Sequence, residues 1–256
     1  MTESDVTDLT DVPDVTDLTG DLVGLFDAAK CVLFDFDGPV CHLFDGHPAS
    51  GIAAELRIWA AQNVPGDVVV EAGSVDDPLA LLRAAALMYP DSDLVKEMEQ
   101  QLTSQELRAT LTAEPTEDAD LLIRRLGAAG FRLAVTTNNS ERAVRSYLER
   151  TGLSDLFGEH IHGRKPDPKL MKPDPDCLRR ALETTGSTAA ESLMIGDSAA
   201  DCRAASTLGV PFLGYARDES KRGPLRWAGA QDKAIVATMS ELLPVLDALE
   251  SAHRMD

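Results

Sequence analysis

Short runs of β-prone apolar residues alternate with stretches of helical spacing along most of the chain after residue 30. We expect strands at residues 31–34, 131–136, 159–162, 193–195, 210–213 and 234–236. Apolar positions three or four apart predict helices around residues 121–126, 144–152, 176–184, 199–208 and 240–251. Strands that alternate with helices imply βαβ units, so the pattern predicts an α/β fold with a doubly wound parallel sheet.

A stretch without strand patterns interrupts this alternation after the first strand. Helical spacing of apolar residues predicts helices at 49–63, at 79–88 and through Leu94, Met98 and Leu102, and the only strand-like run is 68–70. We therefore expect an α-helical cap domain, residues 46–113, inserted into an α/β core made of residues 21–45 and 114–256.

The first twenty residues have a different composition from the rest of the chain. The sequence Asp-Val-Thr-Asp-Leu-Thr occurs twice, from Asp5 and from Asp14, and no aromatic residue appears before Phe26. Such a segment buries too little apolar surface to offset the entropy lost on ordering. We expect residues 1–20 to form a disordered acidic tail.

Charge and cysteine usage narrow the class of protein. The chain of 256 residues has 24 Lys and Arg against 43 Asp and Glu, a net charge of -19, so we expect no nucleic-acid partner. No apolar run is long enough for a membrane span, and the N-terminus lacks the basic and apolar regions of a signal peptide. The 4 cysteines are scattered, which favours reduced thiols in a cytoplasmic protein. The oligomeric state is not readable from the sequence.

Acidic and hydroxyl side chains follow three of the predicted strands. Asp35 and Asp37 end the first strand, Thr137 follows the second, and Asp197 follows the strand at 193–195, with Asp201 four residues later. Ligands of open α/β sheets bind outside the carboxyl ends of the strands, so these side chains should meet there. Carboxylates crowded at one edge repel each other unless a hard cation relieves them, and oxygen ligands select Mg²⁺.

A lysine would complete a set of groups suited to phosphoryl transfer. A carboxylate nucleophile, a second carboxyl group for proton transfer, a hydroxyl donor and Mg²⁺ supply the rest. Lys165 and Lys172 each precede Pro-Asp-Pro. We choose Lys172, because a helical stripe begins shortly after it, whereas Lys165 follows the strand through a longer irregular stretch.

Four motifs in order give the chain its resemblance to a known family. They are Asp35-Phe36-Asp37-Gly38, Thr137-Asn138, Lys172-Pro173-Asp174-Pro175, and Gly196-Asp197-Ser198 with Asp201. Over about residues 30–215 the chain resembles the haloacid dehalogenase superfamily, and within it the branch of phosphoglycolate phosphatase and β-phosphoglucomutase, which has a helical cap after the first motif. Each motif alone is typical of a turn or a helix cap, but the four together are specific. Pro39 departs from the family pattern and removes an amide from the following turn.

The resemblance implies a role for each motif residue. Asp35 would attack phosphorus and form an aspartyl-phosphate, and Asp37 would protonate the leaving oxygen and later deprotonate water. Thr137 would hold a phosphoryl oxygen, with Gly38 and Asn138 as further substrate-binding residues, and Lys172 would neutralise charge. The expected Mg²⁺ ligands are Asp35, the Asp37 carbonyl and Asp197, with Asp201 as a further acidic contact.

The function implied is a Mg²⁺-dependent phosphatase for a small phosphorylated metabolite, resembling phosphoglycolate or a sugar phosphate. Asp37 favours phosphate over carbon–halogen chemistry, since a halide leaving group needs no proton. A phosphomutase of the β-phosphoglucomutase type needs the same residues and stays open as an alternative. A non-enzymatic phosphoacceptor domain is a second alternative, although such receiver domains are about half as long and lack the insert.

Overall fold

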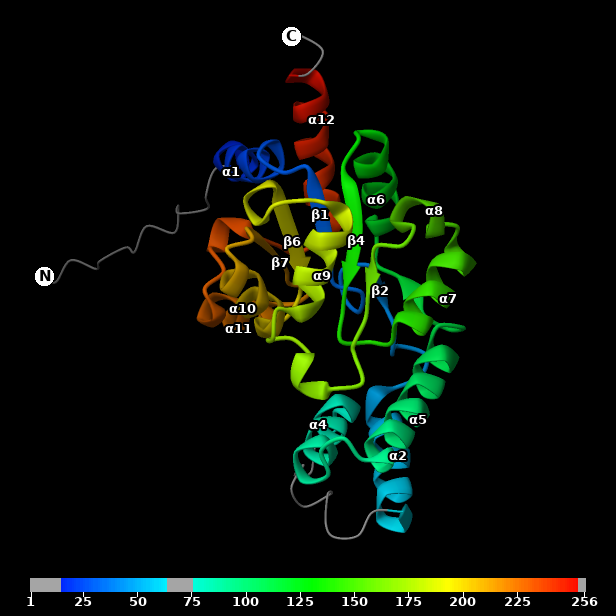
Figure 1. Ribbon diagram of the computed structural model, residues 1–256. Helices are drawn as coiled ribbons and strands as arrows, with labels where there is room; N and C mark the ends of the chain where they lie inside the picture. The colour runs from blue at the N-terminus through cyan, green and yellow to red at the C-terminus, as the bar shows by residue number, and fades with distance from the viewer. Residues whose placement is uncertain (1–14, 64–75, 253–256) are drawn as a thin grey trace, which may run out of the picture.

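A computed structural model describes residues 15–63 and 76–252, and its centre is a six-stranded sheet (Figure 1). Every strand pairing in this sheet is parallel, in the order β5-β4-β1-β6-β7-β8. The strands are β1 (Cys31–Phe34), β4 (Arg132–Thr136), β5 (Ile161–His162), β6 (Ser192–Gly196), β7 (Phe212–Tyr215) and β8 (Ile235–Val236). The fold class expected from the sequence is confirmed.

Helices cover both faces of the sheet. One face packs on α1 (Val15–Asp27), α6 (Ala119–Ala128), α7 (Glu141–Thr151), α8 (Ser154–Phe157) and α12 (Leu243–Ala252), and the other on α9 (Asp176–Thr185) and α10 (Ala199–Leu208). Helix α11 (Glu219–Ala228) contacts α10. In β1, Val32 and Phe34 belong to the first core and Cys31 and Leu33 to the second, which explains the uninterrupted apolar run.

Four short 3₁₀ turns join these elements within residues 15–63 and 76–252. They are η1 (Pro168–Leu170), η2 (Ala189–Glu191), η3 (Asp232–Ala234) and η4 (Met239–Leu242).

Three of the described helices form a separate unit beyond the carboxyl ends of the strands (Figure 1). They are α2 (Ala49–Asn63), α4 (Pro78–Met88) and α5 (Asp93–Ala109), and they share an apolar cluster that includes Ile52, Leu82 and Met98. Asp77 caps the first turn of α4 and Ser92 that of α5. The connections to the core form the antiparallel pair β2 (Cys41–His42) and β3 (Glu114–Pro115).

The structure corrects the expectation for the N-terminal tail. Helix α1 begins at Val15, so residues 15–20 are helical, and residues 1–14 lie outside the described part of the chain. Leu22 and Phe26, one helical turn apart, are buried in the main core. Averaging composition over the first twenty residues concealed the start of this helix.

Two further differences concern local elements. Helix α11 was not expected, because Gly223 and Pro224 interrupt its pattern; Pro224 nevertheless lies inside the helix. The strand expected at 210–213 is β7, two residues further on. The strand-like run at 68–70 lies outside the described residues.

Candidate active site at the carboxyl edge of the sheet

Three adjacent central strands bring the motif residues together. Asp35 follows β1, Thr137 follows β4 and Asp197 follows β6. They border a cavity of about 330 Å³, together with Asp37, Asn138, Asn139, Lys172, Ser198, Asp201 and Lys221 from the core and Phe44, Ala49, Asp76, Asp77, Pro78, Leu79 and Glu106 from the cap and its entry. The cavity therefore lies between the sheet edge and the cap.

Lys172 reaches the first motif from the loop that precedes α9. Its Nζ donates to Asp35 Oδ1 at 2.9 Å and to the Thr136 carbonyl at 2.8 Å, and it pairs with Asp201 Oδ1. Burial favours the neutral amine, but the Asp201 and Asp35 carboxylates outweigh it and raise the pKa of Lys172. Lys165 is exposed. The structure thus places Lys172, and not Lys165, beside Asp35.

Asp35 lies in a buried and crowded electrostatic environment. Burial, reinforced by the Asp201 carboxylate, raises the pKa of Asp35 to about 7, although Lys172 acts in the opposite direction. Oδ1 accepts hydrogen bonds from the Phe36 amide at 2.8 Å and from Lys172. Within the described residues these bonds engage Oδ1, so Oδ2 is the oxygen available to a phosphorus atom in the cavity.

Asp37 has the properties required for proton transfer. Burial is the main cause that raises the pKa of Asp37 to about 6, and its Oδ1 accepts the Leu43 amide at 2.9 Å. A carboxyl group with a pKa near neutrality can both donate and accept a proton.

The turn after the first motif requires glycine. Gly38 has a φ of 115°, and a Cβ there would lie 2.5 Å from Asp197 Oδ2. Its absent side chain lets the first and fourth motifs approach each other. The expected substrate-binding role of Gly38 remains a prediction.

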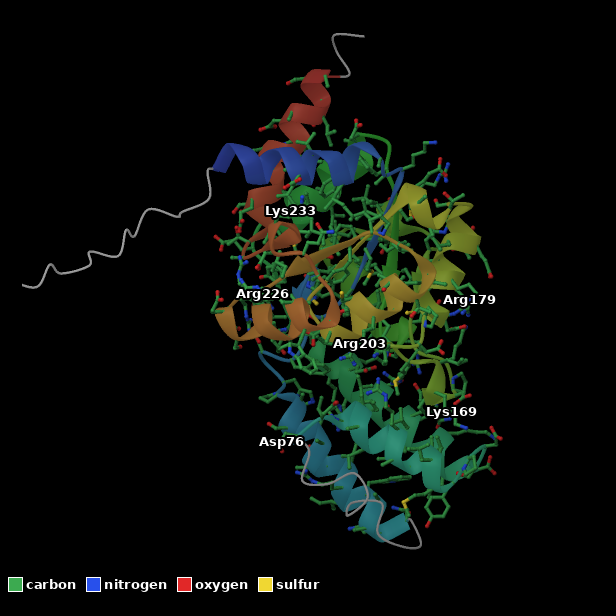
Figure 2. All side chains as sticks on the ribbon, turned by 90° about the vertical axis from the view of Figure 1, so that its left-hand side faces the viewer. Asp76, Lys169, Arg179, Arg203, Arg226 and Lys233 are labelled. Carbon is green, nitrogen blue, oxygen red and sulfur yellow. The ribbon has the colours of Figure 1, made fainter. Side chains whose placement is uncertain are left out.

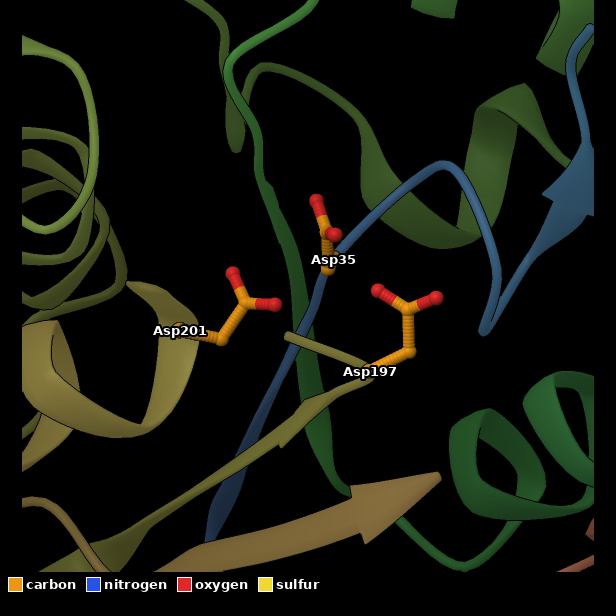
Figure 3. A group of neighbouring side chains, drawn as sticks. All are labelled: Asp35, Asp197 and Asp201. Carbon is orange, nitrogen blue, oxygen red and sulfur yellow. The ribbon is translucent and has the colours of Figure 1, made fainter. Parts of the chain in front are cut away.

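Three carboxylates converge where a cation could bind (Figure 3). One oxygen each of Asp35, Asp197 and Asp201 lies within 4.8 Å of the others. With Asp37 there are four carboxylates and two lysines, Lys172 and Lys221, so the fully ionised cluster keeps an excess of two negative charges. An oxygen-only donor set with this charge fits Mg²⁺.

Asp201 has a second structural task. Its Oδ2 accepts hydrogen bonds from the Ser198 amide at 3.0 Å and the Ser198 hydroxyl at 2.6 Å, and the Ser198 hydroxyl caps the helix in return. Both carboxylate oxygens are engaged, one by this capping box and one by Lys172. Asp201 therefore orients Lys172 in addition to adding negative charge beside the candidate cation site.

The second motif holds the lysine loop as well as bordering the cavity. Asn138 Oδ1 accepts the Lys172 amide at 2.7 Å, and Asn138 Nδ2 donates to the Lys172 carbonyl at 3.2 Å. The Asn138 side chain thus braces Lys172, a task that differs from its expected substrate contact. Thr137 is buried, and its hydroxyl donates to Asn139 Oδ1 at 3.0 Å.

Sequence reasoning missed three residues at this site. Lys221 pairs with Asp197, and it lies on α11, the helix that glycine and proline concealed. Glu106 and Arg164 form a buried ion pair next to the second motif. One signal existed: the predicted stripe of Met98 and Leu102 continues at the same spacing to Glu106, a charged residue on an apolar face.

Fold and site together define a class of protein: a doubly wound α/β enzyme with a capped carboxylate site at the sheet edge. A family model described as haloacid dehalogenase-like hydrolase matches residues 29–209. The chain therefore belongs to the haloacid dehalogenase-like hydrolase family. The predicted family and the predicted enzyme class are confirmed.

Curated relatives include several phosphatases. The chain is 30% identical over 204 residues to a phosphoglycolate phosphatase of Rhodospirillum rubrum, with 74% of this chain and 82% of the relative covered. It is 30% identical over 196 residues to a phosphoglycolate phosphatase of Psychrobacter arcticus, with 72% and 82% covered.

Solved structures share the fold. CbbY from Rhodobacter sphaeroides in complex with phosphate has a TM-score of 0.59 at 20% identity, covering 86% of this chain and 99% of CbbY. A haloacid dehalogenase-like family protein from Streptococcus pneumoniae has a TM-score of 0.57 at 16% identity, covering 88% and 99%. Among the described helices, none combines the length and hydropathy needed to cross a membrane.

Proposed function

We propose that this hydrolase is a Mg²⁺-dependent phosphatase that cleaves a small phosphorylated metabolite through an aspartyl-phosphate. The observation that carries the proposal is the placement of Asp35: a buried carboxylate in a cavity, 2.9 Å from Lys172 and grouped with Asp197 and Asp201. Asp37, two residues along, supplies a carboxyl group with a pKa of about 6.

The proposed reaction has two displacements at phosphorus. Asp35 Oδ2 attacks the phosphorus atom, and the bond to the leaving oxygen breaks as that oxygen takes a proton from Asp37. Asp37 then removes a proton from water, which attacks the phosphorus of the aspartyl-phosphate. The bond from phosphorus to Asp35 breaks, and inorganic phosphate leaves.

Other groups would hold the phosphoryl oxygens and offset their charge. Thr137 would donate its hydroxyl to one oxygen, and Lys172 would neutralise charge that builds between Asp35 and the phosphoryl group. Asp35, the Asp37 carbonyl and Asp197 would hold Mg²⁺, with Asp201 beside them. When bound, the cation would supply positive charge to the phosphoryl oxygens and lower the pKa of its carboxylate ligands.

The residues on the cap side of the cavity would face the leaving group of the substrate. Among the described residues that line the cavity from the cap side, the charged ones are Asp76, Asp77 and Glu106, and none is Lys or Arg. Asp76, labelled in Figure 2, pairs with Arg57 of α2 at 3.9 Å. Because Arg57 pairs with Asp76 and Arg164 pairs with Glu106, two of these three charges are offset, and both a sugar phosphate and phosphoglycolate stay within the proposed substrate class.

A substrate panel tests the proposal. Phosphate release from sugar phosphates, glycerol phosphate, phosphoglycolate and an aryl phosphate would be measured with Mg²⁺, in the wild type and in Asp35→Asn. We expect release by the wild type from at least one of these substrates, and none by a folded Asp35→Asn variant. Release that survives Asp35→Asn contradicts the nucleophile, and phosphate retained on a rearranged sugar indicates a phosphomutase.

A further inference from the structure

A buried ion pair joins the cap to the loops of the candidate active site. Glu106, on cap helix α5, is 0% exposed, and its Oε1 accepts Arg164 Nη1 at 2.5 Å. Arg164 lies on the loop after β5, its side chain is 1% exposed, and Nη2 also donates to Thr103 Oγ1 at 2.8 Å. A buried pair of this kind is costly to disturb, because removing one member leaves the other charged and unpaired.

The same carboxylate holds the second motif. Glu106 Oε1 accepts Asn139 Nδ2 at 3.2 Å, and Glu106 Oε2 accepts the Ser140 amide at 2.9 Å. Arg164 adds main-chain contacts to this loop, because its amide donates to the Asn139 carbonyl at 3.0 Å. A Cβ at the neighbouring Gly163 would lie 2.7 Å from that carbonyl, so this close approach requires glycine.

Hydrogen-bond polarity then determines how Thr137 is presented. Both oxygens of the Glu106 carboxylate accept hydrogen bonds, so Asn139 turns its amide nitrogen to Glu106 and its Oδ1 towards Thr137. Oδ1 accepts the Thr137 hydroxyl at 3.0 Å, and the Asn139 main-chain amide donates to Thr137 Oγ1 at 3.2 Å. These two bonds fix the position of Oγ1 at the cavity wall. The hydroxyl has one proton, so a phosphoryl oxygen would receive it by rotation of the hydroxyl away from Asn139 Oδ1, while the Asn139 main-chain amide keeps Oγ1 in place.

We propose that Glu106, held by Arg164, is a positioning residue that acts through Asn139 to place the Thr137 hydroxyl for binding a phosphoryl group. This inference rests on the proposed function, because that function supplies the phosphoryl ligand. It adds roles for Glu106, Arg164 and Asn139, which the proposed function does not use. We call the chain of contacts from Glu106 through Asn139 to Thr137 the relay. Because Glu106 belongs to the cap and Thr137 to the core, the relay also makes the affinity for a phosphoryl group depend on the position of α5 relative to the core. A merely structural ion pair would support folding without affecting what Thr137 contributes.

A double-mutant cycle with Glu106→Gln and Thr137→Val separates these roles. The readout is the Kd of inorganic phosphate, measured by calorimetry on the full chain at saturating Mg²⁺, so it does not depend on turnover. We expect Glu106→Gln to weaken phosphate binding about tenfold, which is about 1.4 kcal/mol, in the wild-type background. In the Thr137→Val background, where no hydroxyl is left to place, we expect less than a twofold further loss.

Two other variants make the test robust. Glu99→Gln is the matched control: Glu99 also pairs with Arg164, at 3.0 Å, from the same helix. We expect it to change the Kd of phosphate by less than twofold. Asn139→Ala interrupts the relay at its next member, so it replaces Glu106→Gln in the cycle if that variant does not fold, with the same expected coupling.

The relay is overturned if Glu106→Gln, or Asn139→Ala in its place, raises the Kd of phosphate by the same factor in the wild-type and Thr137→Val backgrounds. It is also overturned if the variant leaves the Kd of phosphate unchanged. Absence of phosphate binding by the wild type also overturns it. The proposed function has a separate criterion, since it fails when the wild type releases no phosphate from any member of the substrate panel.

Discussion

Lys165 and Lys172 precede the same Pro-Asp-Pro sequence, yet their environments differ in the folded chain. Lys172 is 2% exposed and contacts Asp35, whereas Lys165 is exposed. We expect Lys172→Ala to lower kcat/KM by about 10²-fold or more, because a buried donor beside the nucleophile stabilises charge that develops there. Lys165→Ala is the matched control, and we expect a change of less than about tenfold.

The measurement is steady-state kinetics with an aryl phosphate at saturating Mg²⁺, with folding checked by circular dichroism. A larger loss for Lys165→Ala would mean that the third motif lies seven residues earlier than we place it. The roles proposed for the aspartates would not depend on that outcome.

The environment of His162 should make the free energy of unfolding depend on pH. Burial, aided by Arg180, lowers the pKa of His162 to about 4, and its Nε2 bonds to Thr184 Oγ1 at 2.9 Å. The unfolded state takes up the proton near pH 6.5, before the folded state does. The stability that the neutral ring contributes is therefore present above pH 6.5 and lost as the pH falls towards 4, by at most about 3 kcal/mol.

Urea unfolding of the wild type and His162→Gln between pH 7.5 and 4.5 checks this expectation. As the pH falls, the free energy of unfolding of the wild type should decrease more than that of His162→Gln. His160→Gln is the control, since His160 also bonds to Thr184 but is less buried. A pH-independent difference for His162→Gln would contradict the prediction.

At the scale of elements, α1 belongs to the folded core. Phe26 is 0% exposed and meets Phe131 edge to face, with 6.3 Å between ring centroids. We expect Phe26→Ala to lower the free energy of unfolding by about 3–5 kcal/mol, the usual cost of a cavity left by a buried aromatic ring. Asp27→Ala, at an exposed position on the same helix, should change it by less than about 0.5 kcal/mol.

Chemical denaturation of the three proteins measures these differences. A loss below about 1 kcal/mol for Phe26→Ala would show that α1 contributes little to the stability of the core.

At the scale of the whole molecule, folding gathers the carboxylates of Asp35, Asp37, Asp197 and Asp201 around one cavity. A cation that binds this cluster and not the unfolded chain stabilises the fold by about 2.7 kcal/mol at 100 times its Kd. For a chain of this size, Mg²⁺ should then raise the melting temperature by about 5–10 °C. Asp197→Asn should remove most of that shift, because it deletes one charged ligand.

Scanning calorimetry over a Mg²⁺ titration provides the readout. Asp155→Asn, a loss of the same charge at an exposed position, serves as the control and should keep the wild-type shift. An equal shift in Asp197→Asn and the wild type would place the cation elsewhere.

The sequence by itself determined most of the elements and the main chemistry of this protein, although it did not reveal α11 or the start of α1. Apolar periodicity is a local property, so it identified the strands of the core and the helices of the cap. The catalytic candidates could be predicted for the same reason: Asp35, Thr137 and Asp197 each follow a strand, and parallel strands end at one edge.

Tertiary structure decided what depends on contacts between distant segments. Lys165 and Lys172 share their following residues, and only the path of the loop before α9 brings one of them to Asp35, 137 residues away. The ion pair of Glu106 and Arg164 spans 58 residues and joins α5 to the loop after β5, so local spacing could not reveal it. Local patterns report which face of an element is apolar, whereas the partners of a buried charge are set by how the elements pack.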